Sequence, residues 1–391
     1  MSTRARLTAL FGVLAAVVAV VIVLALAARP AAVSAAPSSE IAVAAGLDDC
    51  GDGWGDGGRA AGGTAAFDVD NTTVGGVEVY LQAVDTQKVY LDLESIGAGA
   101  HAHARVTLGS GRYRFVCLPA DADPVRGPTV AVGPAPRGSA LTPGIVPVTR
   151  ADLIPAAQAY GAWVASRLPA LRRQAAAVAA DAEEGDLAAA RRDWLTAHST
   201  YETLGAAYGA FGEVGDAIDG LPGHGLTGFH AVEAPLYTAA PASAVVGPAQ
   251  KLVADIDRLI AAFPSAQIDP GDMGLRAHEI VEDALRDVLA GAADAGSGTE
   301  LATIDANLSG ARQALAPLHD ILASRYPDLA ATQQSITTTQ TLVEGFRGAD
   351  GTWTRLSALT TAQREHVDAA LSETAELLAP VAAICAPRRN P

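Results

Sequence analysis

Hydrophobic and polar residues alternate in short runs along the first part of the chain, as they do in β-strands that bury one face. Turn-forming Gly, Asp and Asn residues separate these runs, which cover Thr64–Asp70, Val77–Ala83, Lys88–Leu93, Ala104–Leu108 and Arg112–Cys117. Short strands packed this closely along the chain predict a small β-sandwich. We assign it to residues 44–133, after an Ala-, Pro- and Ser-rich linker at residues 29–43.

The pattern changes after a Pro- and Gly-rich linker at residues 134–148. Beyond it, apolar positions recur with a period of about 3.6 residues, which predicts α-helices. Helices are expected around residue 230 and at residues 152–180, 187–211, 248–263, 275–289, 300–325, 329–346 and 361–384. Their short connections are typical of helical bundles, so residues 149–391 are expected to form one large bundle or two fused ones.

The N-terminus has the features of an export signal. Arg4 and Arg6 precede an uncharged apolar run that extends to Ala28. The run is long enough to span a bilayer as a helix, and the positive charge before it predicts that the remainder of the chain is exported. Small residues at Ser34–Ala36 offer a site for signal peptidase. We expect residues 1–28 to be a signal peptide or an uncleaved membrane anchor, which would place the protein in the cell envelope, outside the cytoplasm.

The charge balance limits the choice of partners. Acidic residues outnumber basic ones by 43 to 27, and the formal net charge is -16. Nucleic-acid binding depends on Lys and Arg side chains that neutralise phosphates, so this balance argues against a nucleic-acid partner. It suits a protein that attracts cations or a basic partner, although solubility alone also explains it.

Two of the three cysteines, Cys50 and Cys117, fall within the expected sandwich. In an exported protein a disulfide between them is the default interpretation. The alternative is that both thiolates bind a metal ion. His101 and His103 also lie in this domain, but it contains no methionine, and this argues against a blue-copper centre.

Three expected helices carry imidazole and carboxylate groups at helical spacing. His230 and Glu233 are three residues apart and His198 and Glu202 are four apart, so each pair shares one face of its helix. The third helix carries His278, Glu279 and Glu282. Carboxylates that face the inside of an Ala- and Leu-rich bundle need a cation or a hydrogen-bond donor to offset their desolvation. We therefore hypothesise a shared metal site in the bundle.

These groups also have plainer interpretations. His198 and Glu202 can form an exposed pair on the helix surface. His230 can be a buried histidine that is hydrogen-bonded to a backbone carbonyl. The third helix can be solvated, with Glu279 and Glu282 flanking Arg286. If a metal is bound, Fe3+ suits carboxylates, whereas mixed imidazole and carboxylate ligands also accept Fe2+, Zn2+ or Cu2+.

Pro235 constrains the helix that carries the first pair. It lies two residues after Glu233 and removes one helical hydrogen bond. It should therefore kink this helix or confine His230 and Glu233 to its first turns.

Several motifs resemble a known family. Gly228-Phe-His-Ala-Val-Glu matches the Gly-Phe-His-x-x-Glu signature of the imelysin-like family, and Ala277-His-Glu-Ile-Val-Glu is similar to one of its later helices. Upstream, Gly76-Val-Glu-Val-Tyr and Gly111-Arg-Tyr-Arg-Phe-Val-Cys resemble the cupredoxin-like domain of EfeO-type iron uptake components. The linked order of the two domains makes the resemblance more specific than the His-x-x-Glu motif alone.

The resemblance implies an envelope protein that binds iron and passes it to a membrane iron permease, with a haem-dependent peroxidase as a further partner. It also implies that His230 and Glu233 are metal ligands and that Glu202 is the best third candidate. A second metal site, in the sandwich, is associated with Cys50, Glu78 and Cys117.

We therefore expect a cupredoxin-like β-sandwich followed by an imelysin-like all-α bundle, and favour a metal-binding protein for iron uptake over an enzyme. The metal candidates are His198, Glu202, His230, Glu233, Glu279, Glu282, Cys50, Glu78 and Cys117. One alternative is a metallopeptidase of the imelysin type, although the chain lacks the His-Glu-x-x-His motif of many zinc peptidases. Another is a non-catalytic envelope interaction module, for which more than 5% aromatic residues would be expected.

Overall fold

The computed structural model of the protein describes residues 40–220 and 225–389. The expected leader at residues 1–28 and most of the linker at 29–43 lie outside these residues. Internal contacts divide the chain into two compact units on either side of Gly144 and Ile145, which we call the β-domain (residues 40–144) and the helical domain (residues 145–389). None of the helices in the described part combines the length and apolar character that a membrane span requires.

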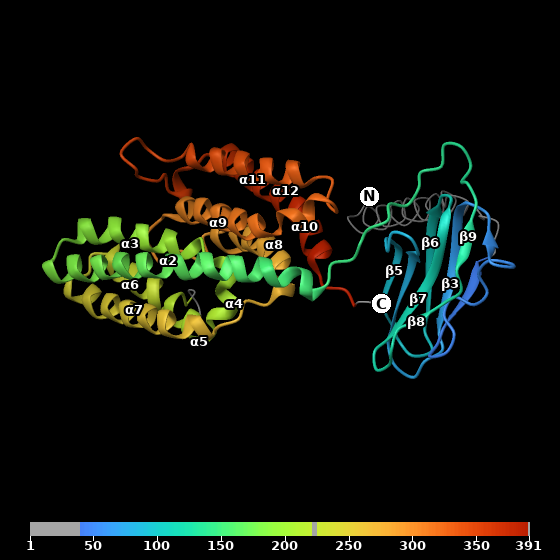
Figure 1. The fold of residues 1–391 in the computed structure, drawn as a ribbon. Coiled ribbons are helices and arrows are strands. Elements are labelled where there is room, and N and C mark those ends of the chain that lie inside the picture. The colour runs from blue at the N-terminus through green and yellow to red at the C-terminus, as the bar shows by residue number, and fades with distance from the viewer. Residues whose placement is uncertain (1–39, 221–224, 390–391) are drawn as a thin grey trace, which may run out of the picture. The chain divides into compact units, whose positions relative to one another are not determined.

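The β-domain is a sandwich of two sheets (Figure 1). In the described residues, the smaller sheet has the order β1–β3–β6 and consists of β1 (Ile41–Ala45), β3 (Gly63–Asn71) and β6 (His101–Leu108). The larger sheet has the order β2–β9–β7–β4–β5, with β8 beside β7. Its strands are β2 (Arg59–Ala60), β4 (Val77–Ala83), β5 (Val89–Ile96), β7 (Gly111–Pro119), β8 (Val125–Arg126) and β9 (Val130–Val132). The expected strands correspond to β3 to β7, and β1 begins inside the stretch expected as a linker.

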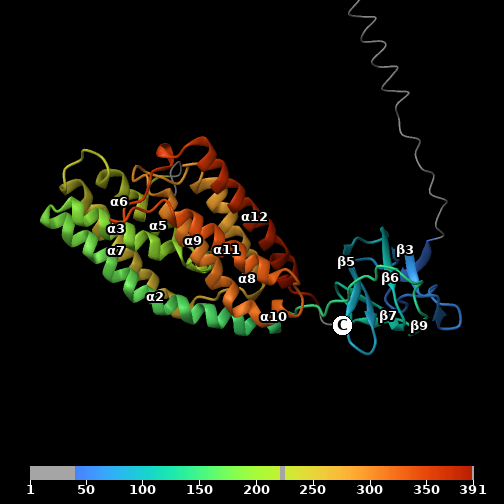
Figure 2. The same ribbon diagram turned by 90° about the horizontal axis from the view of Figure 1, so that it is seen from above.

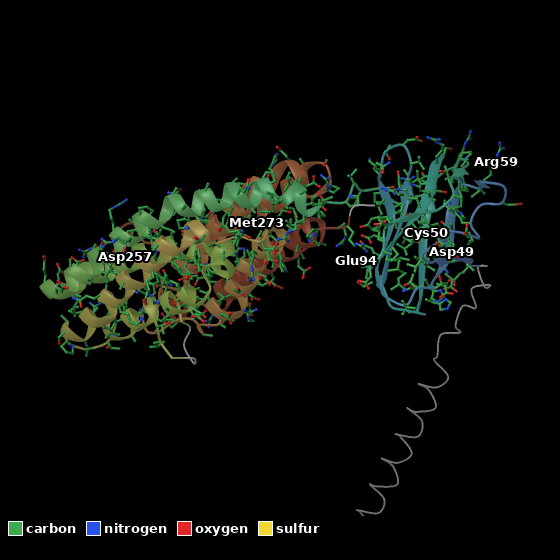
Figure 3. All side chains as sticks on the ribbon, turned by 60° about the horizontal axis from the view of Figure 1, so that its bottom comes forward. Asp49, Cys50, Arg59, Glu94, Asp257 and Met273 are labelled. Carbon is green, nitrogen blue, oxygen red and sulfur yellow. A yellow bond between two sulfur atoms is a disulfide. The ribbon has the colours of Figure 1, made fainter. Side chains whose placement is uncertain are left out.

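Aromatic side chains and a disulfide fill the space between the two sheets. Phe67 of β3 and Phe115 of β7 pack edge to face with ring centroids 5.1 Å apart, and Trp54 contacts both rings at 5.6 Å. Cys50, labelled in Figure 3, is bonded to Cys117, and both are almost fully buried. Apolar packing and one covalent cross-link therefore hold the sandwich together.

The disulfide overturns the metal site expected in this domain. Cysteine binds metal as the thiolate, and neither Cys50 nor Cys117 is free. Glu78, the third expected ligand, accepts a hydrogen bond from the Tyr80 hydroxyl at 2.7 Å. The disulfide interpretation is confirmed, and the expected metal site of Cys50, Glu78 and Cys117 is wrong.

The helical domain consists of long helices joined by short connections and shorter helical segments (Figures 1 and 2). The long helices are α2 (Arg150–Glu184), α3 (Leu187–Glu202), α7 (Ser243–Ala262), α9 (Glu300–Leu315), α11 (Leu329–Glu344) and α12 (Thr361–Cys385). The shorter helices are α4 (Tyr208–Phe211), α5 (Glu213–Ile218), α6 (Gly228–Leu236), α8 (Met273–Asp283) and α10 (His319–Ala323). A π-helical turn, η4 (Ala284–Val288), continues α8.

These helices form one bundle. α2 packs against α3 and α7, and α8 packs against α9 and α12. A single cluster of buried apolar side chains extends from Val148 to Cys385 through the described part of the domain. Local signals fix the ends of the longest helix: Thr149 and Asp152 form a capping box at the start of α2, and Gly185 ends it with a φ of 81°.

Two expected helices are interrupted. The helix expected at residues 187–211 ends as α3 at Glu202, and a 3-10 turn at Gly205–Ala207 leads into α4. Gly205 lets α8 come close, because a Cβ atom there would lie only 2.9 Å from Cγ1 of Ile280. The helix expected at residues 300–325 ends as α9 at Leu315, just before Pro317, whose nitrogen cannot donate a helical hydrogen bond.

Candidate metal centre

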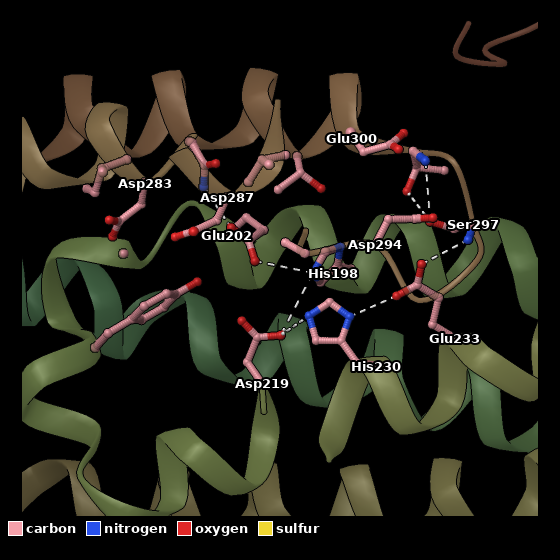
Figure 4. Close-up of a pocket in the computed structure, with 18 of the residues that line it drawn as sticks. His198, Glu202, Asp219, His230, Glu233, Asp283, Asp287, Asp294, Ser297 and Glu300 are labelled. Atoms are coloured by element: carbon pink, nitrogen blue, oxygen red, sulfur yellow. Dashed lines mark hydrogen bonds and ion pairs between the residues drawn. The ribbon is translucent and has the colours of Figure 1, made fainter. Parts of the chain in front are cut away.

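A cavity of about 220 Å³ lies inside the helical domain (Figure 4). Its wall comes mainly from α3, α6, α8 and α9, together with the residue after α5 and the segment that precedes α9. The acidic lining residues in the described part are Glu202, Asp219, Glu233, Glu279, Asp283, Asp287, Asp294 and Glu300. The basic lining residues there are His198, His230 and Arg276. The cavity is therefore strongly acidic.

Three of these groups converge on one point. His198 on α3, Asp219 after α5 and His230 on α6 each offer one ligand atom within 4.8 Å of the others. Asp219 Oδ1 is 3.4 Å from His230 Nε2 and 4.0 Å from His198 Nε2. Glu202 lies one turn after His198 on α3 and places Oε1 3.2 Å from His198 Nε2. Two imidazole nitrogens and two carboxylate oxygens thus face a common space (Figure 4).

Several of these atoms are buried without a hydrogen-bond partner. Among the described residues, both ring nitrogens of His198 and Oδ1 of Asp219 are in this position. His198 Nε2 and Glu202 Oε1 are close, but they are not aligned for a hydrogen bond. An unpaired buried polar group costs roughly 1–3 kcal/mol. A cation between these atoms would supply the missing partner, so the residues present fit a metal ion.

Glu233 lies beside His230 at the centre. Its Oε2 atom accepts a hydrogen bond from His230 Nδ1 at 2.8 Å. Its Oε1 atom accepts hydrogen bonds from the backbone N–H groups of Ala295 at 3.1 Å and Ser297 at 2.9 Å. Both carboxylate oxygens therefore accept hydrogen bonds in this structure, and the assignment of Glu233 as a direct ligand stays a prediction. The side chain fixes the tautomer of His230 so that Nε2 is free to face the centre.

A glycine brings His230 next to Asp219. Gly228 begins α6 with a φ of 51°, a left-handed conformation that favours glycine. A Cβ atom at this position would lie 1.7 Å from the carbonyl oxygen of Ile218, so only a glycine lets α6 start against the end of α5. Pro235 lies in the last turn of α6, which ends at Leu236. The prediction that Pro235 confines His230 and its partner to the first turns is confirmed.

Neighbours from α9 and α3 hold the other ligand candidates. Asn307 donates a hydrogen bond from Nδ2 to Glu202 Oε2 at 2.7 Å, which leaves Oε1 directed at the centre. The ring of Trp194 stacks on His198 at 4.8 Å between centroids, and its Nε1–H donates to the carbonyl of Phe229 at 3.0 Å. This support makes the arrangement rigid before any ion binds.

Burial and charge act against each other at the centre. Burial disfavours the charged form of His198, but the carboxylates of Glu202, Asp219 and Glu233 outweigh it and raise the pKa of His198 to about 9. Burial, followed by the charge of Glu202, raises the pKa of Asp219 to about 6. Burial also opposes the charge of Glu233, yet its hydrogen bonds prevail and lower its pKa to about 2. Metal ions bind deprotonated ligands, so a cation at this centre would displace the proton from His198.

The sequence profile of the Imelysin family matches residues 156–381. The chain belongs to the imelysin family. The matched residues include the whole centre, from Trp194 to Asn307, and leave the β-domain outside. No protein of curated function matches the chain.

Glu279 and Glu282, the other expected ligands in the imelysin domain, do not join the centre. Glu279 lines the cavity, but its Oε2 atom accepts a hydrogen bond from Arg276 at 2.6 Å. Glu282 is not among the lining residues; it is half exposed and lies 3.3 Å from Nε2 of His278. The structure therefore does not bring Glu282 to the centre, because its carboxylate lies outside the cavity lining and beside His278.

Asp219 and Asn307 are residues of the imelysin centre that the sequence analysis did not identify. Asp219 follows a short helix in a Gly-rich segment, so no helical spacing relates it to His230. Asn307 did carry a signal. Helical spacing from Ile304 and Ala311 places its amide on the buried face of α9, where a polar group needs a partner.

Proposed function

We propose that the protein is the extracytoplasmic iron-binding component of an iron uptake system, which holds iron in the helical-domain cavity and delivers it to a membrane permease. The observation that carries this proposal is the convergence of His198, Asp219 and His230 through buried atoms that lack hydrogen-bond partners. The acidic lining adds to it, because a cleft with one sign of charge concentrates ions of the opposite sign.

The donor set favours iron as the cargo. Two imidazoles with one carboxylate are the ligands that proteins use for Fe2+, and Glu202 adds a second carboxylate. Fe3+ prefers a shell with more oxygen. Cu2+ and Zn2+ also accept imidazole and carboxylate, so they are expected competitors. We therefore propose Fe2+ as the form that binds at this centre.

The partners and location follow from the two-domain resemblance and the expected leader. An EfeO-type component resides in the cell envelope and has a membrane iron permease as its recipient, with a haem-dependent peroxidase as a further partner. The apolar segment before Ala28 would export or anchor the chain. We also propose that the β-domain is a cupredoxin-like domain.

The positions of the carboxylates favour a carrier over a metallopeptidase. A peptidase needs a general base beside an open metal position. Both oxygens of Glu233 are engaged, and one oxygen of Glu202 is held by Asn307. The remaining oxygen of Glu202 and Oδ1 of Asp219 face the centre itself, where they would bind the ion rather than act as a base beside it.

Anaerobic titration of the full chain with Fe2+ tests the proposal. The wild type should bind one equivalent in the cavity. His230→Ala and Asp219→Asn should each weaken binding by more than the roughly 10–100-fold that loss of an outer-shell partner costs. The matched controls are His319→Ala and Glu282→Gln, which remove an exposed imidazole and a half-exposed carboxylate of the same domain. Both controls should keep the wild-type affinity.

The outcomes separate the candidate functions. Unchanged Fe2+ affinity in both cavity variants would overturn the carrier proposal. Metal-dependent cleavage of peptides by the wild type, lost in His230→Ala, would favour the peptidase. Absence of both activities would favour the envelope interaction module.

A further inference from the structure

A second hollow of the helical domain lies on the side of α3 and α9 that faces away from the metal centre. It is a groove of about 520 Å³, a volume typical of small-molecule sites. On α3, Thr200 lines the groove, whereas His198 and Glu202, each two residues away and so on the opposite face of the helix, line the metal cavity. On α9, Asp305 and Asn307 are divided in the same way. Among the described residues, the groove and the metal cavity therefore share two helices but no lining residue.

Two tryptophans form opposite walls of the groove. Trp163 belongs to α2, and Trp353 lies in the segment after α11. Because α2 packs against α3 and α11 packs against α9, the floor formed by α3 and α9 separates the two rings. Both indoles are partly buried and pack against the core of the domain. The chain has four tryptophans, so half of them line this one groove.

An arginine is stacked on each of these tryptophans. Cζ of Arg167 lies 5.4 Å from the centre of the Trp163 ring, and Cζ of Arg347 lies 5.8 Å from the centre of the Trp353 ring. Contact with an aromatic face orients the planar guanidinium and the directions of its N–H donors. In the described part of the chain, neither guanidinium forms an ion pair with a carboxylate, although the net charge is -16. Two oriented cationic donors on opposite walls suit the acidic groups of a ligand.

The floor of the groove presents hydrogen-bond acceptors. Thr196, Thr200 and Thr203 each donate their hydroxyl hydrogen to a backbone carbonyl of α3, at 2.9, 2.9 and 2.7 Å. Their oxygens keep lone pairs for a donor from the groove. Oδ1 of Asp305 accepts a hydrogen bond from Gln340 at 2.8 Å, which leaves acceptor capacity on this carboxylate. A ligand made only of carboxylates has no hydrogen to donate to this floor, whereas the hydroxyls of a sugar do.

We propose that this groove binds an acidic saccharide, with its carboxylates held by Arg167 and Arg347 and its hydroxyls donating to Asp305 and to the threonines of α3. A simple anion matches only the walls, and a neutral sugar matches only the floor. The indoles of Trp163 and Trp353 supply apolar surface for the C–H groups of a sugar ring. The site is separate from the metal centre and does not depend on the proposed iron binding.

Calorimetric titration of the full chain with trigalacturonate, a saccharide of three uronic acid rings, tests the site. Maltotriose is the matched neutral probe with three rings, and succinate carries two carboxylates without a hydroxyl. Trigalacturonate should bind, and the other two probes should bind at least about tenfold more weakly, because each lacks one of the two sets of hydrogen bonds.

Variants of the groove identify the residues that bind. Arg167→Gln/Arg347→Gln should weaken trigalacturonate binding at least about tenfold, since hydrogen bonds to charged groups are lost. The matched control is Arg173→Gln/Arg192→Gln, which changes the net charge equally at exposed arginines of α2 and α3 outside the groove. This control should keep the wild-type affinity. Thr200→Val preserves the shape of the side chain but removes its acceptor, and should weaken binding by about 2–10-fold.

Chemical protection in the wild type gives a second, site-resolved measurement. Phenylglyoxal modifies accessible arginines, and peptide mass spectrometry locates them. Bound trigalacturonate should protect Arg167 and Arg347, whereas Arg173 and Arg192 stay reactive. The proposal would be overturned by absence of trigalacturonate binding, by equal affinity in the groove double variant, or by equally tight binding of maltotriose or succinate. Fe2+ affinity should be the same in both double variants, so failure here is distinct from failure of the iron proposal.

Discussion

The helical domain buries His198 and His230, whereas the β-domain carries His101 and His103 on a sheet surface. The side chains of His198 and His230 are only 5% and 3% exposed, against 53% and 61% for His101 and His103. Both pairs lie beside carboxylates at similar distances. Only the environment differs, and the environment sets the energetic cost of each arrangement.

In the helical domain, desolvation must be offset by neighbours or by an ion. The offset is incomplete, because His198 and Asp219 keep buried atoms without hydrogen bonds. In the β-domain, water solvates the charges, and the stability of the sandwich comes from its apolar core and the disulfide. The buried centre is therefore held rigidly and lowers the stability of the metal-free protein. The surface patch of His101 and His103 can rearrange and changes the stability of its domain little.

The largest expected effect tests the part of this comparison that concerns the β-domain. Replacing Cys50 and Cys117 together by Ala should lower the free energy of unfolding of the β-domain by about 2–5 kcal/mol, the usual cost of losing a native disulfide. The helical domain and its Fe2+ affinity should not change. Hydrogen exchange read by peptide mass spectrometry resolves the two domains within the full chain.

Cys385→Ala is the matched control. This cysteine is free and buried in the helical core, so its replacement should affect exchange in the helical domain alone. A loss of protection in the helical domain after removal of the disulfide would show that the two domains are not energetically separate.

The next effect sharpens the distinction between a ligand and a residue that positions one. Glu233→Gln places an amide where His230 now donates its Nδ1 hydrogen. The amide NH2 group would favour the opposite tautomer, with the hydrogen on Nε2, and block that nitrogen as a ligand. Fe2+ affinity should fall by about 10–100-fold, less than for His230→Ala. Glu233→Asp, which retains an acceptor, should recover part of the loss in the same titration.

The features of the fold and of the centre that could be predicted are those that depend on residues close together in the sequence. Alternation in β3 to β7 and the helical period after residue 148 are local patterns, and they gave the two domains and most elements. Just after α3 ends at Glu202, Gly205 allows a close approach to Ile280 of another helix, which is a tertiary contact. No local pattern carries that information.

The same reasoning applies to the centre. Helical spacing identified His198 with Glu202 and His230 with Glu233, because each pair belongs to one helix. It could not bring in Asp219, whose position depends on how α6 starts against α5 at Gly228. Nor could it distinguish a ligand from its support, since the backbone donors that occupy Glu233 come from residues 295 and 297, far along the chain.

A smaller effect concerns pH in the metal-free protein. The pKa of His198 is about 9 in the folded state, above the value of about 6.5 for an unperturbed imidazole. The folded state then binds the proton more tightly, so this contribution to stability is complete below about pH 6.5 and is lost as the pH rises through 9. We expect the Tm of the helical domain to fall over this range by a few degrees, since about 1 kcal/mol corresponds to about 2–4 °C in a domain of this size.

Thermal unfolding in the presence of a chelator measures this trend, and His198→Gln should flatten it. Asp219 has its raised pKa of about 6 in the same centre and acts over a lower range. Its contribution is complete below about pH 4 and is lost as the pH rises through 6. A Tm that rises between pH 6.5 and 9 would contradict the assigned charge on His198.

The smallest expected effect lies on the β-domain surface. Asp68→Asn removes the carboxylate between His101 and His103, but these pairs are solvated, and exposed ion pairs contribute about 0.2–1 kcal/mol. The free energy of unfolding of the β-domain should therefore change by less than about 1 kcal/mol in chelator. The difference from wild type should shrink further in 1 M salt, where the screening length is about 3 Å. A loss of more than about 2 kcal/mol that persisted in high salt would mean that these contacts are not ordinary solvated ion pairs and contribute to the stability of the β-domain.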